Sequence, residues 1–197
     1  MRAMTTSMAI GIVVTVIVSM TASAASAEAP ERFRGRIVDI GSGMTQGGTW
    51  WMTFHIDATT PNEDVAALAQ TLAADGQKAF IAATRALEPT GWIRIGNNTR
   101  WHVSVIRSGV APDGSRVIRG FTDRPIQMAE IFGSYRTRDY TLGMVELRLD
   151  AEGKGSGILL PMAQISFNEA GDIEIESFGN QPFRVMNVSP EKLKEKK

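Results

Sequence analysis

A change of hydrophobic period at Gly91 constrains the fold of this chain more than any other feature of its sequence. From that residue onward, apolar and polar side chains alternate along most segments, and Asn97-Asn98 and Pro112-Asp113-Gly114 interrupt them. Alternation with period two indicates strands that bury one face, which is typical of antiparallel sheets. Asparagine tolerates the positive φ of tight hairpins, and Pro-Asp-Gly favours a β-turn. The second half of the chain is therefore predicted to be antiparallel β structure.

About eight or nine strands are expected in total. Two of them precede Gly91, and the second contains two adjacent tryptophans, which must point to opposite faces of a strand. Trp50 is expected in the core with Phe54, and Trp51 on the face that carries His55, either beneath a helical segment or lining a pocket. The expected strands cover residues 34–40, 49–57, 92–95, 100–107, 116–121, 144–150, 157–167, 173–178 and 183–188.

Between the second and third expected strands, the hydrophobic period becomes that of a helix. Thr60 and Glu63 have the spacing of a capping box, and Gly76 supplies a stop for a first helix. A second helix is expected from Gln77 to Leu87, because Pro89 ends it. The apolar positions that recur at helical spacing in the first helix are Val65, Leu68, Ala69 and Leu72.

These elements predict an α+β fold. We expect an antiparallel curved sheet or partly closed β-barrel with one helical hairpin inserted after the second strand, and a two-sheet sandwich is the alternative. The sequence contains no linker and no internal repeat, so residues 28–189 are expected to form a single globular domain. Residues 190–197 are expected to form a charged C-terminal tail.

Residues 1–27 have the features of a secretory signal peptide. Arg2 precedes an apolar run over residues 9–20, and the small residues of Ala25-Ser26-Ala27 favour cleavage before Glu28. The alternative is an uncleaved anchor, although an apolar core nearer ~20 residues is wanted to span a bilayer. Cleavage predicts a periplasmic or extracellular protein without stable membrane insertion. The chain contains no cysteine, which excludes a disulfide framework, thiol chemistry and cysteine-ligated metal.

The two histidines of the chain are the main candidates for catalysis. His55 and Asp57 lie on one side of their expected strand, and His102 lies on another strand. Together they could bind a metal ion or orient a base only if the two strands were neighbours with these faces together. A strand histidine more often forms an ordinary hydrogen bond. We therefore predict no metal site, no cofactor and no catalytic residue, and a hydrolase or metal-dependent enzyme using these three residues is the alternative.

Charge is distributed unevenly along the chain. Residues 85–138 contain nine arginines and no lysine against four acidic residues, whereas residues 139–188 contain eight acidic residues against three basic ones. One interpretation is an anion site, because guanidinium groups match phosphate and carboxylate oxygens and tryptophan can stack beside them. The other is that cross-strand pairs neutralise these charges. The candidate ligand-binding residues are Trp51, Trp92, Arg94, Arg100, Trp101 and Arg107.

The stretches Asp123–Ile126, Gly157–Met162 and Gln181–Val188 resemble those of a family of small exported bacterial proteins that has no assigned activity. The resemblance covers most of the chain after residue 27, and it implies export and a single domain. We therefore expect an exported, non-catalytic binding or structural domain of the cell envelope. Its partner would be an unknown small ligand or an envelope protein. Nucleic acid is not an expected partner, because 21 basic residues balance 21 acidic ones.

Overall fold

A computed structural model describes residues 29–38, 48–98, 100–126, 142–167, 173–177 and 182–193. The expected signal peptide, residues 39–47 between the first two expected strands and the last four residues of the expected tail lie outside these ranges. Within them, no helix combines the length and the apolar character needed to cross a bilayer.

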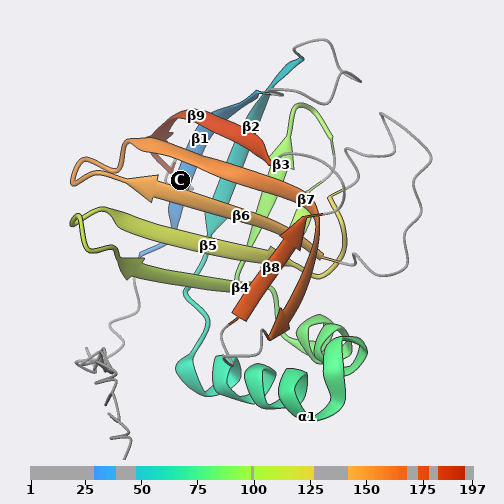
Figure 1. Cartoon of the computed structure of the whole chain (residues 1–197). Coiled ribbons are helices and arrows are strands. Elements are labelled where there is room, and N and C mark those ends of the chain that lie inside the picture. The colour runs from blue at the N-terminus through green and yellow to red at the C-terminus, as the bar shows by residue number, and fades with distance from the viewer. Residues whose placement is uncertain are drawn as a thin grey trace, which may run out of the picture.

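Eight of the described strands form a closed antiparallel barrel (Figure 1). Around the barrel, β1 to β7 follow one another in chain order. β9 then pairs with both β7 and β1 and completes the ring, and β8 is not part of it. The extra strand, β8 (Ile173–Ser177), pairs with the segment of β7 that extends beyond its pairing with β9. The barrel strands are β1 (Glu31–Val38), β2 (Thr49–Ile56), β3 (Gly91–Ile95), β4 (Trp101–Val110), β5 (Arg116–Thr122), β6 (Leu142–Leu149), β7 (Gly155–Phe167) and β9 (Phe183–Pro190).

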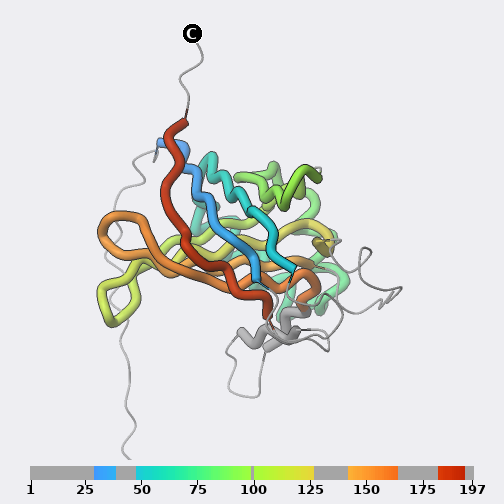
Figure 2. Tube along the Cα trace, turned by 90° about the horizontal axis from the view of Figure 1, so that it is seen from above, coloured from blue at the N-terminus to red at the C-terminus, as the bar shows by residue number. Residues whose placement is uncertain are grey.

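The prediction of a curved antiparallel sheet or partly closed barrel is confirmed at this level, and the closure is complete. β1 and β9 lie side by side (Figure 2), with Phe33 opposite Pro190 and Ile37 opposite Val185. This pairing joins the two ends of the sheet, which distinguishes the barrel from a sandwich of two separate sheets.

The inward-facing side chains of the barrel strands form its core. Met52 and Phe54 on β2, Ile93 on β3 and Leu147 on β6 have no exposed surface. An eight-stranded barrel is just wide enough for such side chains to fill it. At Gly120 on β5, a Cβ atom would lie only 3.0 Å from the Phe54 ring, so the filling is tight. Binding surfaces are therefore to be sought on the outside of the barrel.

The helical segment α1 (Asn62–Ala86) follows β2, as expected, and lies outside the barrel against β4 and β7 (Figure 1). Gly76 breaks the helix with φ 75° and ψ −175°, a conformation that glycine adopts at little cost. The break lies where the sequence predicts the end of the first helix. Residues on both sides of it, Leu72 and Phe80, belong to one apolar cluster with Val105 of β4 and Leu142 of β6.

The predicted capping box at Thr60 does not form. Pro61 occupies the N-cap position of α1, and no side-chain hydrogen bond caps the helix. Thr60 is buried instead, and its Oγ1 accepts a hydrogen bond of 2.8 Å from the backbone amide of Ile106 on β4. The Thr60 amide donates in turn to the Ile106 carbonyl at 2.9 Å. Thr60 therefore joins the start of α1 to the barrel, because its hydroxyl and its amide both form hydrogen bonds with the backbone of β4.

We expect Thr60→Val to lower the free energy of unfolding by about 1–3 kcal/mol, because the buried Ile106 amide would lose its acceptor. Thr71→Val is a matched control, since Thr71 Oγ1 donates to the Ala67 carbonyl on an exposed part of α1. Its effect should stay within about 0.5 kcal/mol. Urea denaturation followed by circular dichroism measures both variants. Equal losses would contradict the proposed role of Thr60.

Candidate functional site

The outer face of β1 carries a row of arginines. Phe33 and Ile37 on this strand point into the barrel core, so the alternating residues Arg32, Arg34 and Arg36 point outward. Successive outward residues on a strand lie about 7 Å apart. The strand therefore presents a regular series of three guanidinium groups.

Cross-strand register places aromatic side chains beside this row. Arg32 lies opposite His55 on β2, and His55 lies opposite Trp92 on β3. Trp92 lies in turn opposite His102 on β4. One line of side chains thus crosses the outer face of four adjacent strands.

The Trp51 ring lies beneath two arginines of β1. The Cζ atom of Arg34 is 4.4 Å from the centroid of the Trp51 ring, and that of Arg36 is 5.5 Å away. Trp51 nevertheless remains 51% exposed, so part of its ring is available to a ligand. Such cation–π contacts contribute about 0.5–1 kcal/mol each at exposed sites.

Trp92 is the centre of a second group. The Cζ atoms of Arg100, Arg32 and Arg94 lie 4.1, 5.5 and 5.9 Å from the centroid of its ring. The His55 ring lies against the same tryptophan, with a centroid distance of 5.1 Å. We call this surface the arginine–tryptophan face, and its residues are Arg32, Arg34, Arg36, Trp51, His55, Trp92, Arg94 and Arg100.

The positive charge of this face is not neutralised locally. None of its five arginines forms an ion pair with a carboxylate of the described residues. The nearby Asp57 accepts a hydrogen bond of 3.0 Å from Nε2 of His55. Nε of Arg32 and Nδ1 of His55 are buried and have no hydrogen-bond partner within the described ranges. The face therefore holds an excess of positive charge and unsatisfied polar atoms.

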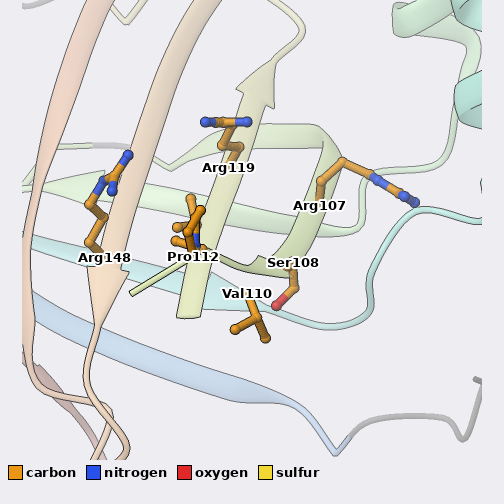
Figure 3. A pocket seen from close by; sticks show the side chains of 9 residues that line it. Arg107, Ser108, Val110, Pro112, Arg119 and Arg148 are labelled. Atoms are coloured by element: carbon orange, nitrogen blue, oxygen red, sulfur yellow. The ribbon is translucent and has the colours of Figure 1, made fainter. Parts of the chain in front are cut away.

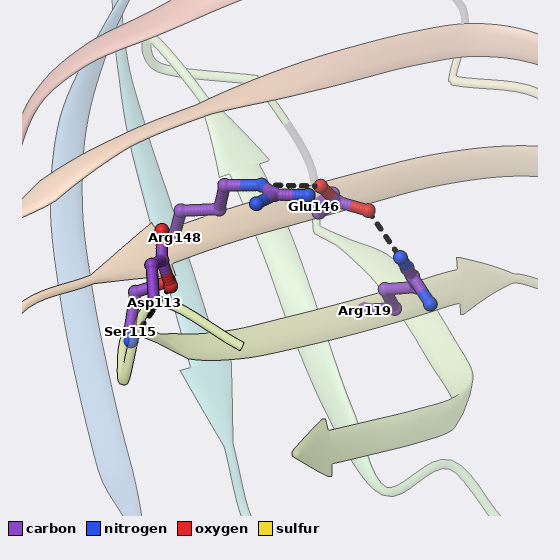
Figure 4. Close-up of polar contacts among 5 residues, drawn as sticks. All are labelled: Asp113, Ser115, Arg119, Glu146 and Arg148. Atoms are coloured by element: carbon purple, nitrogen blue, oxygen red, sulfur yellow. Dashed lines mark hydrogen bonds and ion pairs between the residues drawn. The ribbon is translucent and has the colours of Figure 1, made fainter. Parts of the chain in front are cut away.

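Arginines on the opposite side of the barrel are compensated. Glu146 on β6 accepts hydrogen bonds from Nε of Arg119 at 2.7 Å and from Nε of Arg148 at 3.2 Å (Figure 4). Arg116 on β5 is paired differently, because it forms two hydrogen bonds of 2.8 Å with the carboxylate of Glu31 on β1, the strand that carries the arginine row. Pairing with carboxylates thus describes these arginines, and contact with tryptophan describes those of the arginine–tryptophan face.

The pairing changes the titration of Glu146. Burial of its carboxyl group acts to raise the pKa, but the hydrogen bonds and charges of Arg119 and Arg148 outweigh burial and hold the pKa below its ordinary value of 4.5. In the neighbouring turn, Oδ1 of Asp113 accepts hydrogen bonds from Oγ and the amide of Ser115 at 2.6 and 2.9 Å (Figure 4). These bonds lower the pKa of Asp113 and close the predicted turn between β4 and β5.

The six predicted ligand-binding residues do not all lie together. Trp101 points into the barrel core and is 4% exposed. Arg107 on β4 points toward the start of α1. Its Nη1 donates to the Thr60 carbonyl at 3.1 Å and to Asn62 Oδ1 at 2.8 Å. The structure brings together the other four, which are Trp51, Trp92, Arg94 and Arg100.

Sequence reasoning missed the three arginines of β1. The signal was present, because Arg32, Arg34 and Arg36 occupy every second position, and the last two lie in the strand expected over residues 34–40. The row lies outside residues 85–138, whose excess of arginine indicated the predicted site.

The residues of the enzymatic alternative lie on two sides of Trp92. His55 is buried and bonded to Asp57, whereas the exposed His102 lies two strands away from His55, a separation of about 10 Å. No group of three or more potential metal-ligating side chains occurs in the described part of the chain. The three residues therefore do not converge on one point.

A separate cavity of about 380 Å³ lies on the outer face of β4, β5 and β6. Arg107, Arg119 and Arg148 contribute to its lining, together with Val110 at the end of β4 and Pro112 in the turn that follows (Figure 3). It lies apart from the arginine–tryptophan face, with which it shares no residue.

No family model, no curated protein and no solved structure matches this chain.

We expect the stability difference between the wild type and Glu146→Gln to depend on pH. The folded-state pKa of Glu146 is lowered, so its stabilising contribution is present above the ordinary value of 4.5 and is lost as the pH falls through the folded-state pKa. The wild type should unfold at a higher temperature than the variant at about pH 7, and the two should converge on acidification. Differential scanning calorimetry over a pH series measures this.

Glu152→Gln is the control for this experiment, because Glu152 pairs with Lys154 at 3.3 Å in an exposed turn. An exposed pair of this kind contributes little to stability. A difference between the wild type and Glu146→Gln that grew on acidification would contradict the pairing described above.

Proposed function

We propose that this chain is an exported, non-catalytic binding domain of the cell envelope that holds an anionic ligand on its arginine–tryptophan face. The observation that carries the proposal is the gathering of five arginines on two tryptophans without a carboxylate partner among the described residues. Export is inferred from the composition of residues 1–27.

Contact with the tryptophan rings leaves these guanidinium groups able to bind anions. A guanidinium that lies over an aromatic ring uses its flat face, and the N–H groups at its edge remain available to phosphate or carboxylate oxygens. Stacking also retains the full positive charge, whereas an ion pair with glutamate would cancel it. The face is therefore suited to an acidic ligand that approaches from solvent.

The spacing of the arginines favours a polymer with repeated anionic groups. Arg32, Arg34 and Arg36 follow one another at about 7 Å along β1, and Arg94 on β3 lies two strands from Arg34, about 10 Å across the sheet. The exposed part of the Trp51 ring offers a flat apolar surface beside the charges. We infer a polymer of the envelope that carries phosphate or carboxylate groups.

Binding is better supported than catalysis. His55 is buried against Trp92 and bonded to Asp57, and His102 lies beyond that tryptophan. Neither histidine lines the cavity of Figure 3. A hydrolase or metal-dependent enzyme would need a nucleophile, base or metal ligands that face one reacting atom, so it remains the weaker candidate.

The proposal predicts that the chain binds two defined polymers, sodium polyphosphate and polygalacturonate. Quenching of tryptophan fluorescence measures this binding. We expect the double variant Arg34→Gln/Arg36→Gln to weaken binding by about tenfold or more, because two charge-assisted contacts are lost. Binding should also weaken as salt increases, since association releases counterions. Comparison of the two polymers distinguishes phosphate from carboxylate recognition.

The matched control is Arg124→Gln/Lys154→Gln, which removes the same charge from two exposed positions elsewhere. It should change the dissociation constant by less than about twofold. Equal weakening in both double variants would indicate general electrostatic attraction and would overturn the assignment of the face. Failure of the wild type to bind either polymer would overturn the proposed function itself.

A further inference from the structure

A second, larger cavity lies between α1 and the outer face of the barrel. Its volume is about 690 Å³, which is within the range of small-molecule sites. Leu68, Leu72 and Phe80 line it from the helix, and Phe121, Met144 and Leu160 line it from β5, β6 and β7. Packed protein interiors rarely leave such a space, so the helix covers an apolar groove without filling it. We call this space the helix groove.

The helix groove is apolar along its length and basic at one end. Arg107, Arg119 and Glu146 belong to its lining, and the first two also line the cavity of Figure 3. Because the two cavities share these arginines, the helix groove lies beside the cavity of Figure 3, to which Arg148 contributes a third guanidinium. The charged side chains that line the two cavities are thus three arginines and one glutamate among the described residues.

Glu146 holds two of these guanidiniums so that they can still donate. It accepts from Nε of Arg119 and Nε of Arg148, and the Nη atoms of both arginines form no hydrogen bond with the described residues. Arg107 uses Nη1 for the start of α1, so its Nε and Nη2 are similarly without a described partner. Positioned donors next to an apolar groove match a molecule with one anionic end and one apolar end.

We propose that the helix groove and its arginines bind a single-chain anionic amphiphile. The alkyl chain lies between α1 and the strands, and the carboxylate or phosphate head accepts hydrogen bonds from Arg107 and Arg119, with Arg148 adding positive charge. The complementary charge at the mouth favours this occupant over a neutral or cationic one. The site is on a different face from the arginine–tryptophan face, so it does not depend on the proposed function.

The chain-length dependence of binding tests the apolar part of the site. Sodium decanoate, dodecanoate and tetradecanoate are titrated into the full chain below their micellar concentrations and followed by isothermal titration calorimetry. Affinity should rise about fourfold for each methylene group until the groove is filled. Dodecyl phosphate should bind as well, and a comparison with dodecanoate shows which anionic head is preferred. Dodecyltrimethylammonium should bind at least about tenfold more weakly than dodecanoate.

Two matched substitutions on α1 locate the chain. Ala69 lines the groove, whereas Ala66 is exposed on the same helix. We expect Ala69→Phe to fill the groove and weaken dodecanoate binding by about tenfold or more, and Ala66→Phe to leave it unchanged. The wild-type methylene series remains informative even if Ala69→Phe is unstable, because it needs no variant.

Arg119→Gln tests the head-group contact. It should weaken dodecanoate binding by about tenfold. Any binding of octyl glucoside should stay unchanged, because this uncharged detergent has no anionic head group for Arg119 to contact. The Arg34→Gln/Arg36→Gln variant should bind dodecanoate like the wild type.

Three results would overturn this inference: no heat of binding with any anionic amphiphile, no dependence on chain length, or equal effects of Ala66→Phe and Ala69→Phe. A concentration-dependent dimer that Ala69→Phe abolishes would also overturn it, because the groove would then be an interface between two copies of the chain. None of these results bears on polymer binding by the arginine–tryptophan face.

Discussion

The pairing of β9 with β1 on one side and β7 on the other closes the barrel, and the positions of all outer side chains depend on it. Closure gives each of the eight barrel strands a partner on both sides and fixes its register. A shift of one residue in β1 would turn Phe33 and Ile37 toward solvent and send the arginines into the core. The cost of burying those charges holds the arginine row on the outside.

Because side chains fill the interior of the barrel, the candidate binding sites lie on its outer surface, where arginines are held in two ways. On β5 and β6, Glu146 orients Arg119 and Arg148 and offsets one of their two positive charges. On β1 to β3, Trp51 and Trp92 support the guanidinium groups without cancelling their charge. One side of the molecule therefore combines directed donors with an apolar groove, and the other presents a broad positive surface. These properties suit two chemically different ligands.

Local features of the sequence predicted much of this fold. Alternation indicated the strands after Gly91, and Gly76 marked the break in α1 where the chain needs a positive φ. Closure could not be predicted in the same way, because Phe33 and Pro190 are far apart in sequence. Thr60 resembled a helix cap, but a buried hydrogen bond with a distant strand determined its role.

The candidate sites were predicted only in part for related reasons. Alternation alone places Trp101 on the face opposite to Arg100 and His102, which agrees with its burial in the core. An irregularity between Val103 and Val105 then reverses which alternate residues of β4 face the core. Val105 therefore packs against α1 on the outside of the barrel. No local pattern shows such an irregularity. The helix groove was not predicted at all, because its lining comes from α1 and several strands whose positions depend on barrel closure.

The neighbouring positions of β1 and β9 have a consequence for chain connectivity. The start of β1 and the end of β9 leave the barrel at the same rim, where the Glu191 amide donates to the Arg32 carbonyl at 2.7 Å. A short peptide could therefore join these two strands, and the ring could be opened instead at the exposed turn around Gly114. Such a circular permutant would retain every strand pairing of the barrel. The order of the strands around the barrel is thus independent of the order in which a ribosome makes them.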